Sequence, residues 1–120
     1  MARDTYAMAP DASRPPPSNV ELEQSLLGSL LIRNDVLDVV APILDTTDFS
    51  EEIHRRIFDV AKTLIGAGQA ATSHTLQTYL GNPEIAQGVS LSQYIARICT
   101  ESALPIMAKD YARGVRELAE

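Results

Sequence analysis

The 120-residue sequence has little of what disulfide-bonded, zinc-binding or membrane proteins require. Cys99 is its one cysteine, so no intramolecular disulfide can form, and one cysteine with two histidines cannot complete a structural zinc site. Apolar runs such as residues 30–32 fall far short of the ~20 residues that cross a membrane, and the N-terminus lacks the apolar stretch of a signal peptide. We therefore expect a reducing, cytoplasmic setting and no membrane contact.

Basic side chains are also scarce, with 10 Lys and Arg against 16 Asp and Glu and a net charge of −6. Domains that bind nucleic acid usually present a basic face to the phosphates. Neither Lys62 nor Lys109 follows a glycine, so the sequence lacks the Gly-Lys-Ser/Thr ending of a Walker A loop. The sequence therefore predicts no autonomous binding of DNA or RNA, no nucleotide hydrolysis and no cofactor in this chain.

Tryptophan is absent and aromatic residues make up 5% of the chain, whereas 45% of it is hydrophobic, mostly Ala, Leu, Ile and Val. This mixture is typical of helices packed on helices, and a chain of this size can bury about two-thirds of its surface in one domain. Residues 1–17 hold four of the seven prolines and show no apolar periodicity. We expect them to form a flexible arm before a helical domain.

A first helix is predicted to begin at Ser18, which has capping-box spacing to Glu21. Its apolar face recurs every four residues, at Leu22, Leu26 and Leu30. Glu23 is expected on the solvent side. Gly28 costs up to ~1 kcal/mol relative to Ala in the middle of a helix, so it predicts a close approach by another helix.

Apolar stripes, caps and breakers predict five more helices, over about residues 35–41, 51–65, 73–80, 90–100 and 105–120. Phe49 is expected to pack as a hydrophobic staple before the third helix, and residues 81–83 to end the fourth. No strand-like alternation of useful length is present. The fold class is therefore all-α, a small orthogonal bundle of about six helices, and the last helix shows no C-terminal cap.

The side chains that could carry chemistry have plainer interpretations. His54 is expected on a helix surface or at an interface, His74 in a cap region, and the pair Glu51-Glu52 at a helix N-terminus, where it meets the helix dipole. Cys99 is expected to be a small buried hydrophobe, and the tyrosines to be core or interface residues. With catalysis unsupported, protein–protein interaction is the function class that remains.

The opening of the first helix contains the pattern Glu21, Glu23-Gln24 and Leu27-Gly28. This pattern resembles the start of DnaB-type replicative DNA helicases. Further blocks similar to that family follow in the same order: Asp48-Phe49 with His54 and Ile57-Phe58, Thr75-Leu76 with Leu80, Tyr94-Ile95, and Tyr111-Ala112 with Val115 and Arg116-Glu117. The likeness covers about residues 15–120.

The resemblance implies the N-terminal helical domain of such a helicase, which forms a collar on a hexameric ring. ATP and Mg²⁺ would be bound, and single-stranded DNA contacted, by a separate motor domain. The chain would divide into the arm at residues 1–17, the head at 18–103 and, at 104–120, the start of a linking helix that continues into a helical hairpin. The implied partners are further copies of the chain, primase and a helicase loader.

Two sets of residues follow from these considerations. The apolar stripe of the last helix predicts a subunit interface at Met107, Tyr111, Val115 and Leu118. The residues of the family motif are expected to be structural: Glu21, Glu23, Gln24, Leu27, Gly28, Phe49, His54 and Phe58. With only part of the hairpin present, this chain is expected to be a monomer or a weak dimer.

Two alternatives remain open from the sequence. The helicase-binding domain of a primase is thought to share the collar's fold, and the motif at the start of the first helix favours the helicase over it. A small helical DNA-binding regulator is a second alternative, since several short helices could contain a helix-turn-helix. The acidic balance of the chain argues against that regulator.

Overall fold

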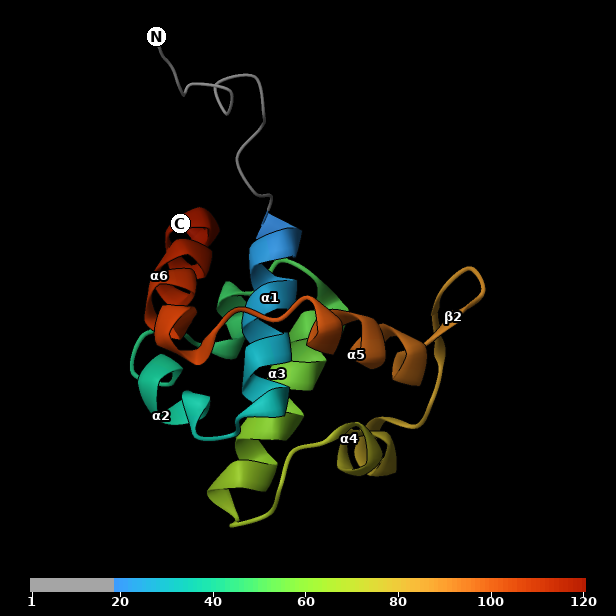
Figure 1. Ribbon diagram of the computed structural model, residues 1–120. Helices are drawn as coiled ribbons and strands as arrows, with labels where there is room; N and C mark the ends of the chain where they lie inside the picture. Colours follow the sequence, from blue (N-terminus) through green and yellow to red (C-terminus); the bar gives the residue numbers. More distant parts are fainter. Residues whose placement is uncertain (1–18) are drawn as a thin grey trace, which may run out of the picture.

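The computed structural model describes residues 19–120, so the predicted arm at residues 1–17 and the Ser18 cap lie outside the described residues. Helices dominate the described part, and the predicted all-α class is confirmed (Figure 1). In chain order the elements are α1 (Asn19–Ile32), α2 (Val36–Val40), the 3₁₀ helix η2 (Thr46–Asp48), α3 (Glu52–Gly66), α4 (Ser73–Leu80), β1 (Glu84–Ala86), β2 (Val89–Ser90), α5 (Leu91–Thr100), the 3₁₀ helix η3 (Pro105–Met107) and α6 (Ala108–Ala119).

Helix α1 lies at the centre of the bundle, between α5 and α6, and also contacts α3 (Figure 1). Every residue from 26 to 31 is buried, so this part of α1 has no solvent-facing side. A helix that is apolar all round is typical of a protein core. The leucines of α1 therefore form the centre on which the other helices pack.

The predicted close approach at Gly28 is confirmed, and the partner is α5. A Cβ atom at this position would overlap the carbonyl oxygen of Ile98 and would lie 2.9 Å from its carbonyl carbon. The amide of Ala103 also donates a hydrogen bond to the carbonyl oxygen of Ser25, at 3.0 Å. The absence of a side chain at Gly28 thus sets the distance between α1 and α5.

Helix α3 is anchored by an aromatic pair. Phe49 precedes the helix and packs on Phe58, with 4.9 Å between ring centroids, as expected for a hydrophobic staple. The guanidinium of Arg55 donates a hydrogen bond to the carbonyl oxygen of Phe49, at 2.8 Å. Both contacts fix the direction from which the chain enters α3.

Capping boxes begin both of the next helices. Thr72 accepts a hydrogen bond from the Thr75 amide at the start of α4, and Ser90 accepts one from the Gln93 amide at the start of α5. Each side chain satisfies a backbone donor that a helix N-terminus leaves free. These two starts agree with the positions predicted from the sequence.

The segment between α4 and α5 differs from the sequence prediction of a loop without strands. It forms a short antiparallel hairpin, in which Glu84 pairs with Ser90 and Ala86 with Val89. Gly88 has a φ of 75° in the turn, a conformation that glycine adopts without strain. Strands of three and two residues are too short to produce a recognisable alternation of apolar and polar residues in the sequence.

Helix α6 packs directly on the head. Its buried residues are Ala108, Ala112 and Val115, and the helix contacts both α1 and α2. Pro105 begins a 3₁₀ turn, so the α-helix itself starts three residues later than predicted. Helix α6 thus shares one hydrophobic core with the helices before it.

Candidate functional site

A buried group of polar side chains joins three helices. We call it the polar clasp and define it as Glu23 and Gln24 of α1, His54 of α3 and Tyr94 of α5. Glu23 is 1% exposed and His54 is fully buried. Buried charged groups are stable only when they are paired and hydrogen-bonded, so the partners of these side chains decide their role.

The hydrogen bonds of the clasp join α1 to α3, α3 to α5, and α5 back to α1. The Nδ1 atom of His54 lies 2.7 Å from Oε1 of Glu23, and its Nε2 atom lies 2.5 Å from the Tyr94 hydroxyl. Gln24 donates to the same hydroxyl at 3.0 Å. In a neutral imidazole, Nδ1–H donates to the carboxylate and Nε2 accepts the hydroxyl proton of Tyr94.

Two effects oppose each other at the Glu23 carboxylate. Burial acts to raise the pKa of Glu23, whereas hydrogen bonds from His54 and from Ser50 act to lower it. The Ser50 amide donates to Oε2 at 2.9 Å. The hydrogen bonds outweigh burial, so the pKa of Glu23 lies below its ordinary value and the carboxylate stays ionised at neutral pH.

The clasp has the carboxylate, imidazole and hydroxyl order of a catalytic triad, but its placement suits a structural role. His54 has no exposed surface, so a substrate cannot reach its imidazole. Burial is also the largest influence on Tyr94 and raises the pKa of its hydroxyl, which disfavours a nucleophilic phenolate. The clasp therefore fixes the positions of α1, α3 and α5 relative to one another.

Two sequence expectations are corrected here. Glu23 does not face solvent and His54 does not lie on the outer surface of its helix, because the two side chains are buried against each other inside the domain. The spacing contained the signal: Glu23 stands three and four residues before Leu26 and Leu27, and His54 stands three and four residues before Ile57 and Phe58. Each polar side chain thus lies on the apolar face of its own helix.

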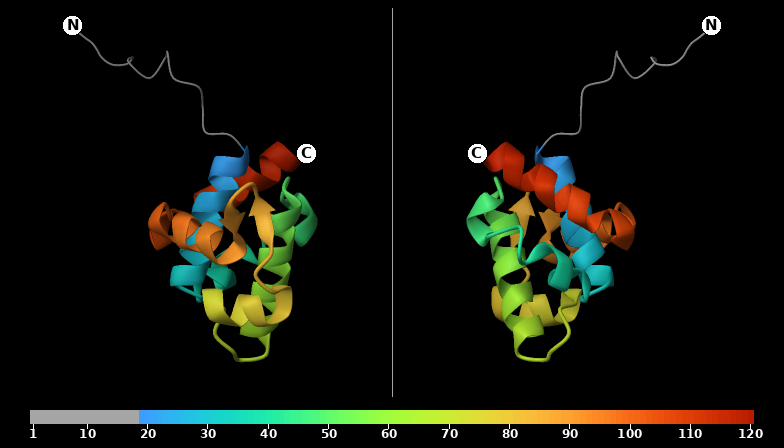
Figure 2. Two further views of the ribbon diagram at one scale, coloured as in Figure 1. Left: turned by 90° about the vertical axis from the view of Figure 1, so that its right-hand side faces the viewer. Right: turned by 90° about the vertical axis from the view of Figure 1, so that its left-hand side faces the viewer.

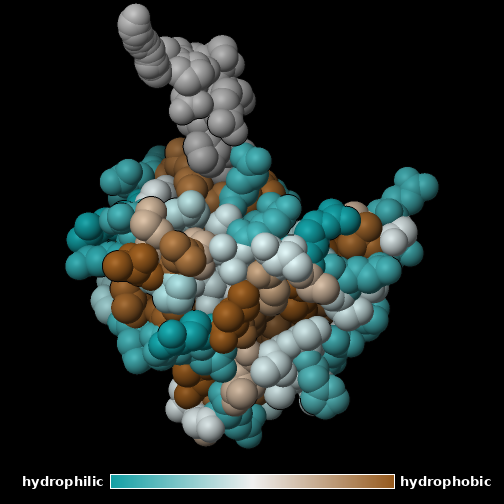
Figure 3. Space-filling model, in the orientation of Figure 1, coloured by the Kyte–Doolittle hydropathy of each residue, from teal (hydrophilic) through white to brown (hydrophobic). Residues whose placement is uncertain are grey.

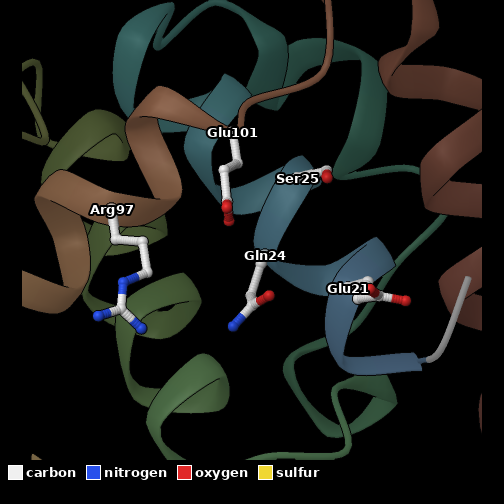
Figure 4. A pocket seen from close by; sticks show the side chains of 5 residues that line it. All are labelled: Glu21, Gln24, Ser25, Arg97 and Glu101. Carbon is white, nitrogen blue, oxygen red and sulfur yellow. The ribbon is translucent and has the colours of Figure 1, made fainter.

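The other motif residues occupy positions that suit packing. Leu27, Phe49 and Phe58 are buried in the core, and Gly28 lies at the α1–α5 crossing. Glu21 is exposed. Five residues line a polar hollow between α1 and α5: Glu21, Gln24, Ser25, Arg97 and Glu101. Figure 4 shows Arg97 on α5 and Glu101, directly after α5, facing Gln24 on α1. The clasp reaches solvent at Gln24.

Cys99 and His74 remain without an assigned chemical role. Cys99 is half-buried, and burial raises the pKa of its thiol, which disfavours the reactive thiolate. His74 is exposed on α4. Within residues 19–120, no group of three His, Cys, Asp or Glu side chains could hold a metal ion.

The residues predicted for subunit pairing divide into two groups. Met107 is 40% exposed and Leu118 48% exposed, and Tyr111 is half-buried. Val115 differs from that expectation, because it is 1% exposed and faces the core beneath α6. Ile106, at 84%, and Leu104 add further exposed apolar surface before α6, and Figure 3 shows brown surface in the region where α6 begins.

The sequence pattern and the fold agree with one protein family. The family model described as the DnaB-like helicase N-terminal domain matches residues 15–117. The chain belongs to this family. The relationship predicted from Glu21, Glu23-Gln24 and Leu27-Gly28 is thereby confirmed, and the polar clasp contains three polar residues of the DnaB-type motif, Glu23, Gln24 and His54.

Named relatives of this DnaB-type domain are replicative helicases. The chain is 35% identical over 103 residues to the replicative DNA helicase DnaB of Rickettsia felis, and 26% identical over 104 residues to the replicative DNA helicase DnaC of Bacillus subtilis. These matches cover 86% and 87% of the chain but 21% and 23% of the relatives. The chain therefore spans about a fifth of the length of the curated relatives it matches.

A solved structure supports the same relationship. The crystal structure of the N-terminal domain of DnaB helicase from Mycobacterium tuberculosis superposes with a TM-score of 0.73 and 26% sequence identity. The match covers 88% of this chain and 73% of the other. Among residues 19–120, no helix has the length and apolar character needed to cross a membrane.

Proposed function

We propose that this chain is the non-catalytic N-terminal domain of a replicative DNA helicase, and that it supports ring assembly and docks primase during DNA replication. The observation that carries the proposal is the DnaB family match over residues 15–117, in a chain that spans about a fifth of the length of its helicase relatives. ATP, Mg²⁺ and single-stranded DNA would be bound elsewhere in the longer protein. A helicase loader is a further expected partner.

The exposed residues of the last helix support the assembly role. Met107, Tyr111 and Leu118 keep apolar surface in contact with solvent, next to the face of α6 that is buried in the head. An apolar stripe on a helix is stabilised when a partner covers it. We propose that these three side chains contact a second subunit. The buried Val115 packs in the core and thereby fixes the position of α6.

The assembly role can be tested by light scattering on the chain extended by about forty residues of its parent, which would complete the expected hairpin. We expect the extended protein to be a dimer and the chain of residues 1–120 to be mainly monomeric. Leu118→Glu should shift the extended protein toward monomer. The control is Tyr79→Glu on α4, a side chain that is 61% exposed and far from this stripe in sequence. A monomer after extension contradicts the pairing proposal.

The docking role needs a separate measurement. Calorimetric titration with the helicase-binding domain of the primase from the same organism is expected to show saturable binding to the extended dimer. Absence of heat with both the single chain and the extended dimer would contradict primase docking and leave the family assignment unaffected.

A further inference from the structure

A groove lies between the first turn of α3 and the hairpin that precedes α5. Its apolar lining, which we call the apolar floor, consists of Ile53, Pro83 and Ile85, and its volume is about 350 Å³. The left panel of Figure 2 shows the hairpin in front, beside α3. The charged residues that line it are Glu51, Glu52, Glu84 and Arg56.

The charges of the groove are not balanced. Arg56 is held by Glu52 at 3.0 Å, so that pair is neutral. Glu84 accepts a hydrogen bond from the Gly88 amide at 3.1 Å, and within residues 19–120 no basic side chain forms an ion pair with Glu51 or Glu84. The two remaining carboxylates therefore flank an apolar floor without a counter-charge.

Both walls of the groove are fixed in the free protein. On the α3 side, Glu23 accepts the Ser50 amide and Arg55 binds the carbonyl oxygen of Phe49. On the hairpin side, the Leu91 amide donates to the carbonyl oxygen of Pro83 at 2.8 Å. A groove held in this way loses little conformational entropy when a ligand enters it.

We propose that this groove docks a basic peptide segment of another protein, with one or two aliphatic side chains on the apolar floor and Lys or Arg beside Glu51 and Glu84. Charge complementarity selects this occupant. Nucleic acid is negative, so the carboxylates of Glu51 and Glu84 repel it. The proposal is independent of primase docking and of pairing through α6.

The first test uses a short synthetic peptide that alternates lysine with leucine and isoleucine, added to the isotopically labelled chain. We expect saturable amide shifts in NMR spectra at residues 51–56 and 83–86. A second peptide, in which serine replaces each leucine and isoleucine, should bind more weakly because it cannot fill the apolar floor. Shifts confined to other surfaces, or no binding of the first peptide, would overturn the proposal.

The second test removes the two unbalanced charges. Glu51→Gln combined with Glu84→Gln is expected to weaken binding of the first peptide by about fivefold, which is the effect of losing two exposed ion pairs. Glutamine at position 84 retains an oxygen that can accept the hydrogen bond from the Gly88 amide. The matched control is Asp110→Asn with Glu117→Gln on α6, which changes the net charge equally. Equal weakening of peptide binding in both double variants would indicate general attraction to an acidic protein. It would overturn the proposal that the peptide binds in this groove.

Discussion

Replacement of Gly28 by alanine tests the helix crossing at the centre of the fold. The added Cβ atom would overlap the carbonyl oxygen of Ile98 and lie 2.9 Å from its carbonyl carbon and 3.0 Å from Cβ of Ser102. Carbon atoms in favourable contact are about 3.5–4.0 Å apart. Because the obstacle is backbone, no side-chain rotation can relieve the overlap, and α5 has to move away from α1.

The size of the effect follows from two opposing contributions. Overpacking a tight core costs about 1–3 kcal/mol or more, and a helical alanine recovers at most about 1 kcal/mol relative to glycine. We expect Gly28→Ala to lower the free energy of unfolding by about 2 kcal/mol. For a folded region of about a hundred residues, this corresponds to a fall in Tm of roughly 8–16 °C.

Gly66→Ala is the matched control for this measurement. Gly66 is the last residue of α3, its Cβ would meet nothing within 4 Å, and its φ is not in the left-handed region. Thermal unfolding followed by circular dichroism should therefore place this variant within about 0.5 kcal/mol of the wild type. A Gly28→Ala protein that melts within a few degrees of the Gly66→Ala protein would refute the close crossing.

Three further outcomes are expected. Glu23→Ala leaves His54 and the Ser50 amide without their acceptor and should cost about 3 kcal/mol in urea unfolding; a loss below about 1 kcal/mol would contradict a structural role for the clasp. Because the fold lowers the pKa of Glu23 from 4.5, its stabilisation is complete above that pH and is lost as the pH falls through the folded-state pKa. The urea midpoint should thus decline below about pH 4.5 more steeply in the wild type than in Glu23→Gln, and equal slopes would count against this cause. Ser90→Ala removes the cap of α5 and should cost about 1 kcal/mol in the same assay, whereas an unchanged midpoint would show that the cap contributes nothing.

Local patterns in the sequence predicted most of the helices. Thr72 and Ser90 cap α4 and α5, residues 81–83 follow the end of α4, and Phe49 packs on Phe58 before α3. These features depend on residues within a few positions of each other, so their physical causes are visible in the sequence itself. The short hairpin was missed because its strands contain too few residues to alternate.

The polar clasp shows where local reasoning fails. Glu23 and His54 are 31 residues apart, and Tyr94 is a further 40 residues along the chain. A glutamate or histidine on a helix is usually solvated, and only the position of a distant partner makes its burial stable. The 3.6-residue spacing could have indicated burial, but it could not have identified the partners.

The features of this protein divide into those set by local sequence and those set by tertiary contacts. The sequence by itself determined the all-α class, the helix starts at capping residues, the need for a close approach at Gly28 and the family of the chain. Only the tertiary structure decided that Val115 is buried while Met107 and Leu118 are exposed, that Glu23 pairs with His54, and that the hairpin faces the start of α3. Where a helix begins and ends depends on capping and breaking residues close in the chain, whereas burial and pairing depend on which helices meet in space.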